Sequence, residues 1–178
     1  MNCIWLIPEA PELGILRGLI DRLASVGGGP RFEPHVTILS GIALDAADLK
    51  DRLKSDLEKF PKFEISLAAT ETGTDFFKAF YLVPEPSEIL DSLRRRAEKL
   101  AEPDLIVSRF DPHISLAYGN FADTERQRMR EITDRALPLA VRFKRASVVR
   151  AAGSIPVASW TPVNSIFFKC DLLEDSSG

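Results

Sequence analysis

Pro34-His35-Val36-Thr37-Ile38 and Pro112-His113-Ile114-Ser115-Leu116 are two copies of one short motif, 78 positions apart. They contain the only two histidines of the chain. Side chains alternate along a strand, so each histidine shares a face with the hydroxyl residue two positions later, while the aliphatic residues point the other way. The motif therefore predicts two similar strands, each with one polar and one apolar face.

The similarity extends outward from these motifs. Trp5-Leu6-Ile7-Pro8-Glu9 corresponds to Tyr81-Leu82-Val83-Pro84-Glu85, and each histidine motif runs on to a glycine and then to a charged amphipathic helix. Asp45 and Asp123 are the expected caps of those helices. We interpret this as an internal duplication within a single bilobal domain of 178 residues. The expected boundaries are about 1–70 for the first repeat, about 75–151 for the second and about 158–173 for a final strand.

The patterning predicts a mixed architecture. Short runs rich in β-branched and aromatic residues predict strands over 2–7, 35–42, 63–69, 76–83, 113–119, 139–150 and 160–172. Apolar residues at helical spacing predict helices around 13–23, 49–57, 89–100 and 129–136. We expect an α+β fold with two antiparallel sheets around a central cleft, outer helices and pseudo-twofold symmetry. Arg94-Arg95-Arg96 would form a solvated helix face, because consecutive helical residues point in different directions.

Composition narrows the functional class. A hydrophobic content of 45% suits one compact domain, and no apolar run is long enough to cross a membrane. The formal net charge of −3 favours a small phosphate ligand over a long nucleic acid, which usually needs a basic face. We expect a cytoplasmic protein, a monomer by default, in which Cys3 and Cys170 are reduced.

Two imidazoles facing one cleft suit acid–base chemistry at phosphorus. An unperturbed histidine titrates near 6.5, so one ring can accept a proton from water while the other donates one to a leaving oxygen. A single histidine in a strand is more often structural than catalytic. Two copies in register, using the only histidines of the chain, favour a catalytic pair of His35 and His113.

The hydroxyls of Thr37 and Ser115 complete the expected site. They can donate hydrogen bonds to the non-bridging oxygens of a phosphate, where charge must be stabilised in the transition state. A strained five-membered cyclic phosphate needs no metal for activation. We therefore expect a metal-independent enzyme without a cofactor.

At this point the sequence resembles the 2H phosphoesterase superfamily, and within it the eukaryotic-type cyclic phosphodiesterases. The resemblance spans nearly the whole chain and rests on both histidine motifs and on the segments 5–8, 29–37, 72–77 and 112–118. It implies hydrolysis of nucleoside 2′,3′-cyclic phosphates to 2′-phosphates, and of ADP-ribose 1″,2″-cyclic phosphate to ADP-ribose 1″-phosphate.

The resemblance also implies roles for individual residues. His35 and His113 would be the acid–base pair, and Thr37 and Ser115 would bind phosphate. Further substrate-binding positions match aromatic residues of the family: Tyr118, Trp5 and Phe77. Strict alternation directs Tyr118 toward the core, so it would reach the cleft only near a strand end or through a bulge. Trp5 and Phe77 have the alternative role of core packing residues.

Two other functions stay open on sequence alone. The chain could be an RNA 2′,3′-cyclic phosphodiesterase or a 2′–5′ RNA ligase-like enzyme acting on an RNA end. It could also bind a nucleotide without turnover, although recognition alone does not need a general acid opposite a general base.

Overall fold

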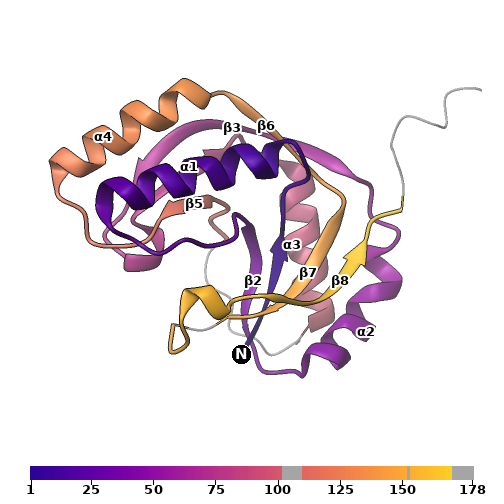
Figure 1. Ribbon diagram of the computed structural model, residues 1–178. Helices are drawn as coiled ribbons and strands as arrows, with labels where there is room; N and C mark the ends of the chain where they lie inside the picture. The colour runs from indigo at the N-terminus through magenta and orange to yellow at the C-terminus, as the bar shows by residue number, and fades with distance from the viewer. Residues whose placement is uncertain (102–109, 152, 170–178) are drawn as a thin grey trace, which may run out of the picture.

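The computed structural model describes residues 1–101, 110–151 and 153–169, and within them an eight-stranded antiparallel sheet with four α-helices (Figure 1). The strand order is β6-β3-β4-β5-β2-β1-β7-β8. The strands are β1 Asn2–Leu6, β2 Val36–Ile42, β3 Phe63–Thr72, β4 Phe80–Pro84, β5 Ile114–Ala117, β6 Leu139–Phe143, β7 Arg145–Arg150 and β8 Pro162–Phe167. The helices are α1 Glu12–Gly27, α2 Ala46–Leu57, α3 Glu88–Ala101 and α4 Asp123–Thr133.

The two predicted sheets are the two halves of this one curled sheet. One half contains β6, β3, β4 and β5, the other β2, β1, β7 and β8. The halves join where Val36 of β2 pairs with Ile114 of β5. These are the residues that directly follow the two histidines, so the junction brings both motifs together. The predicted α+β fold with outer helices is confirmed.

The helices cover the convex faces of the halves in a crossed arrangement (Figure 1). The first helix, α1, follows β1 but packs against β5 and β6 of the other half, beside α4, which contacts β3. Likewise α3 follows β4 but packs against β2, beside α2, which packs against β7 and β8. The apolar stripes that predicted these helices form one continuous core, whose largest fully buried side chains include Phe80, Phe143, Leu16 and Leu53.

Some element boundaries differ from the predictions. Both histidines lie one residue ahead of their strands, which begin at Val36 and Ile114. The predicted strand over 76–83 begins with a 3₁₀ turn, Phe76–Lys78, and the predicted strand over 139–150 is two strands that break at Lys144. Asp45 caps α2 by accepting a hydrogen bond from the Ala47 amide, whereas Asp123 lies in the first turn of α4 and is not its cap.

The solvated face predicted for the arginine run of α3 is wrong for Arg94. This side chain is buried and donates to the Ile38 carbonyl of β2 and to Glu98, with its guanidinium over the Phe110 ring. A buried charge is tolerated only when it is paired and hydrogen-bonded. Arg94 therefore fastens α3 to the strand that follows His35.

No helix in the described part of the chain is long and apolar enough to cross a bilayer.

Candidate active site

A cavity of about 570 Å³ lies where the two halves of the sheet meet. Its walls come from β1, β2, the start of β5, the segment 75–78, and Ala151, Gly153 and Trp160. Every residue predicted for the site lines it: Trp5, His35, Thr37, Phe77, His113, Ser115 and Tyr118. Residues more than a hundred positions apart thus share one concavity.

The two histidines are held in the same way. The Nδ1 atom of His35 lies 2.7 Å from the Glu33 carbonyl oxygen, and that of His113 lies 2.8 Å from the Asp111 carbonyl oxygen. A carbonyl can only accept, so Nδ1 carries the proton in each ring. Nε2 is therefore the atom of each imidazole that is free to exchange a proton. The two motifs therefore share a tautomer as well as a residue type.

His35 is the more enclosed of the pair. Its ring stacks on Trp5, with centroids 3.5 Å apart and planes within 8°. Burial lowers the pKa of His35 to about 4; the Glu33 carbonyl acts against this shift, and the nearby His113 adds to it. Trp5 is itself buried, and one face of its indole is covered by the imidazole. Its clearest contribution to the cavity is thus to orient His35.

His113 is half-buried and has a more polar environment. Burial lowers its pKa, the Asp111 carbonyl raises it and the positive charge of Lys78 lowers it further. Lys78 lines the cavity, pairs with Asp111 and lies 4.6 Å from the centroid of the Tyr81 ring. The Tyr81 ring meets His113 edge-on. Lys78 is the one lysine or arginine among the described cavity residues, and sequence reasoning missed it.

The two hydroxyls differ in their present contacts. Thr37 is half-buried in the cavity wall. The Ser115 hydroxyl donates a hydrogen bond to the Phe77 carbonyl at 3.1 Å. Binding a phosphate through Ser115 therefore requires its hydrogen to turn away from that carbonyl, whereas Thr37 has no such bond among the described residues.

The aromatic side of the cavity is formed by Trp5, Phe76, Phe77, Tyr118 and Trp160. Tyr118 lies just beyond the end of β5, which is how it reaches the cavity despite the alternation of the strand. Its ring stacks on Phe32 at 3.9 Å, and burial raises the pKa of its phenol. Phe77 contacts both Tyr118 and Trp160, and Trp160 also meets Trp5.

Trp160 was not among the predicted site residues. It was expected as the first residue of a strand over 160–172, and the presence of a second tryptophan in the chain was the available signal. The partly exposed rings of Phe77 and Trp160 offer a base a stacking surface that Trp5 lacks.

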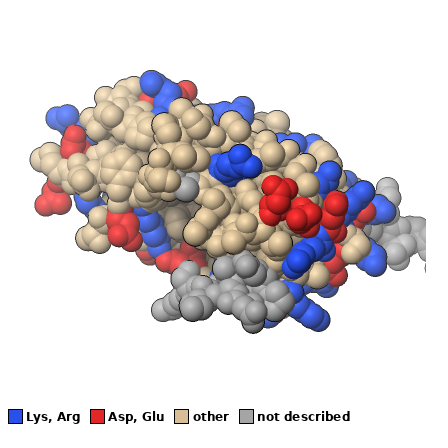
Figure 2. Space-filling model, turned by 90° about the horizontal axis from the view of Figure 1, so that it is seen from below, with Lys and Arg blue, Asp and Glu red and all other residues tan. Residues whose placement is uncertain are grey.

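The charge distribution on the outside is mixed. Figure 2 shows a face on which uncharged residues predominate and Lys and Arg are interspersed with Asp and Glu. On the described part of this face, basic side chains do not gather into a band of the kind that a long nucleic acid requires. The cavity itself is lined mainly by uncharged residues, with Lys78 and Asp75 as its permanent charges among those described.

Comparison with known proteins agrees with this geometry. A family model described as "Cyclic phosphodiesterase-like protein" matches residues 1–168. The chain belongs to this family. Membership supports hydrolysis of cyclic phosphodiesters and confirms the resemblance drawn from the two histidine motifs.

Two relatives of this chain are named as phosphodiesterases. A cyclic phosphodiesterase of Arabidopsis thaliana is 25% identical, over 72% of this chain and 70% of its own length. A 2′,3′-cyclic-nucleotide 3′-phosphodiesterase of Kluyveromyces lactis is 27% identical, over 74% of this chain and 70% of its own length. The fold is shared with E. coli LigT crystallised with NADP+, at a TM-score of 0.63 and 13% identity, covering 95% and 98% of the two chains.

Proposed function

We propose that the protein hydrolyses small cyclic phosphodiesters with His35 and His113 as a general acid–base pair, without a metal ion. The observation that carries the proposal is the matched pair of imidazoles in one cavity, each with Nδ1 fixed on a carbonyl and Nε2 left for proton transfer. The names of the relatives support a nucleoside 2′,3′-cyclic phosphate as one substrate. ADP-ribose 1″,2″-cyclic phosphate is the second that we propose.

The reaction is an in-line displacement. One histidine removes a proton from water as the water oxygen bonds to phosphorus, and the other protonates the ribose O3′ as the bond from phosphorus to O3′ breaks. The product is the 2′-phosphate. Thr37 and the reoriented Ser115 donate to the non-bridging oxygens, and Lys78 supplies positive charge on the His113 side. The next turnover requires one proton to return between the histidines.

Metal independence is proposed from the donor set. In the described ranges 1–101, 110–151 and 153–169, no three His, Cys, Asp or Glu side chains gather closely enough to hold a metal ion. Ring strain in the cyclic phosphate and a protonated imidazole supply the activation that a Lewis acid would otherwise give.

We expect wild-type protein to convert 2′,3′-cyclic AMP to adenosine 2′-phosphate in excess EDTA, because the proposed mechanism uses only side chains and water. A phosphorus NMR time course identifies the product directly, since the 2′- and 3′-phosphates are resolved from each other and from the ring. Activity that disappears in EDTA and returns with a divalent metal would refute the metal-free mechanism, and a 3′-phosphate product would refute the proposed bond cleavage.

The pH dependence follows from the enclosure of the histidines. The productive enzyme has one neutral and one protonated imidazole, and burial lowers the pKa of both, that of His35 to about 4. Raising the pH removes the proton of the acid, and lowering it protonates the base. We therefore expect a bell-shaped kcat/KM profile centred below pH 6.5, whereas unperturbed histidines would centre it near neutrality.

The kcat profile should lie at higher pH than that of kcat/KM, because a bound phosphate anion favours the protonated form of both rings. Initial rates between pH 3.5 and 9 check both expectations. A kcat/KM that still rises above pH 8 would be incompatible with the histidine pair.

A further inference from the structure

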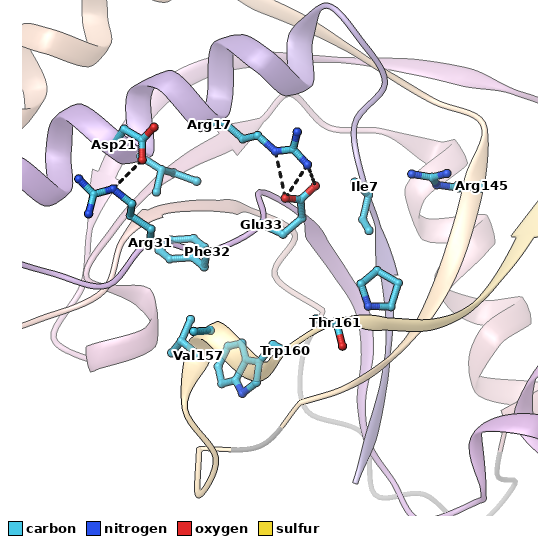
Figure 3. A pocket seen from close by; sticks show the side chains of 13 residues that line it. Ile7, Arg17, Asp21, Arg31, Phe32, Glu33, Arg145, Val157, Trp160 and Thr161 are labelled. Carbon is cyan, nitrogen blue, oxygen red and sulfur yellow. Dashed lines mark hydrogen bonds and ion pairs between the residues drawn. The ribbon is translucent and has the colours of Figure 1, made fainter.

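A second hollow of about 630 Å³ lies between α1 and the segment 157–162, and residues 31–33 also line it (Figure 3). We propose that this groove is an anion subsite, in which Arg145 binds a phosphate carried on the 5′-oxygen of the ribose whose cyclic phosphate is hydrolysed. The inference rests on the proposed function and extends it to the part of the substrate beyond the reacting ring.

The groove continues the catalytic cavity along the same face of the sheet. Trp5 pairs with Ser147 and Leu6 with Ala146, so Arg145 follows Ser147 on the face that carries Trp5. Glu33, two residues before His35, lines the groove, while its carbonyl holds the His35 ring. Trp160 lines both hollows. A ligand that leaves the histidines past Trp160 therefore enters the groove.

One arginine of the groove has no ion-pair partner among the described residues, whereas the others are paired with carboxylates. Arg17 clamps the Glu33 carboxylate at 2.7 Å, and Arg31 binds Asp21 at 2.8 Å (Figure 3). Arg145 has no carboxylate partner among the described residues, and its guanidinium lies 5.8 Å from the centroid of the Phe167 ring. Its Nε is buried without a hydrogen-bond partner, as is Nε1 of Trp160. Two donors that line the groove thus lack acceptors among the described residues, and one of them, on Trp160, also lines the cavity.

A phosphate group fits these donors. The planar fork of an arginine matches two phosphate oxygens, and its charge strengthens both hydrogen bonds. The exposed Arg17 and Arg31 pairs are weak enough to admit a competing anion at the rim. A phosphate on the 5′-oxygen is common to an ADP-ribose cyclic phosphate and to the last nucleotide of an RNA, so the groove would recognise what these two substrates share.

The test compares two substrates that differ by one group, 2′,3′-cyclic AMP and 5′-phosphorylated 2′,3′-cyclic AMP. For Arg145→Ala and Arg145→Gln, we expect the ratio of kcat/KM for the phosphorylated over the unphosphorylated substrate to fall about 10- to 100-fold relative to wild type, mainly through KM. Arg145→Lys should give an intermediate ratio, because it keeps the charge and loses the fork. Both substrates are measured on one preparation, so partial misfolding cancels in the ratio.

Arg150→Ala is the matched control, since Arg150 is exposed at the other end of β7 on the opposite face, and its ratio should equal that of wild type. ADP-ribose 1″,2″-cyclic phosphate and the dinucleotide ApA with a 2′,3′-cyclic end then distinguish the two sources of the 5′-phosphate. The physiological substrate should show the larger loss of kcat/KM in the Arg145 variants. A ratio within twofold of wild type in all three Arg145 variants overturns the subsite alone. Wild type that hydrolyses neither the adenosine substrates nor ADP-ribose 1″,2″-cyclic phosphate overturns both this inference and the proposed function.

Discussion

Replacing either His35 or His113 by alanine should lower kcat by about 10²- to 10⁴-fold, the range that a single acid or base supplies. The double variant should lose little more than the worse single one, because the two rings act in one step. Steady-state kinetics with 2′,3′-cyclic AMP measures all three. The chain has no further histidine that could substitute.

Two controls separate lost chemistry from lost structure. Urea denaturation establishes that each variant is folded, and calorimetry with adenosine 2′-phosphate establishes that the cavity still binds its product. Binding that persists while turnover is lost supports the acid–base pair. Turnover within threefold of wild type in both single variants would refute the acid–base pair, whereas a protein that only binds nucleotides would show no turnover even as wild type.

Trp5→Ala should lower the free energy of unfolding by about 3 to 5 kcal/mol, because it empties a buried site that packs on Cys3, Val149 and Ala151. It also removes the surface on which the His35 ring lies. The loss of stability is measured by the shift of the urea midpoint, with the slope of the transition unchanged.

Two conservative variants separate packing from orientation. Trp5→Leu and Trp5→Phe both keep an apolar side chain, but only phenylalanine keeps a flat ring beneath His35. We expect similar stabilities for the two and a clearly lower kcat for Trp5→Leu. Equal kcat values would mean that Trp5 acts only as a core residue.

The parts of the site that sequence reveals are those repeated within the chain. The two motifs could be identified without a structure because residues two positions apart lie on the same face of a strand. The repetition of the motif also allows its two copies to be compared within the chain. Lys78 and Trp160 have no counterpart of this kind. Each reaches the cavity through an irregular segment, a 3₁₀ turn and a loop, whose path depends on tertiary contacts and not on periodicity.

Arg94 illustrates the same limit in the core. Two further arginines follow it in the sequence of an amphipathic helix, and this run of charge led us to predict a solvated position. Only the approach of α3 to β2 creates the carbonyl partner that makes its burial acceptable. The positions of the four helices in the sequence could be predicted from the helical spacing of their apolar residues. The half of the sheet that each helix covers could not be predicted in this way.

The crossed packing of α1 and α3 has a consequence for folding. Each of these helices buries its apolar stripe against strands that belong to the other half, so neither half is a complete hydrophobic unit by itself. A fragment ending after β3 would leave α1 uncovered unless a second copy received it by domain swapping. The protein should consequently unfold in one cooperative transition, and a half-length ancestor could have buried its first helix only as a swapped dimer.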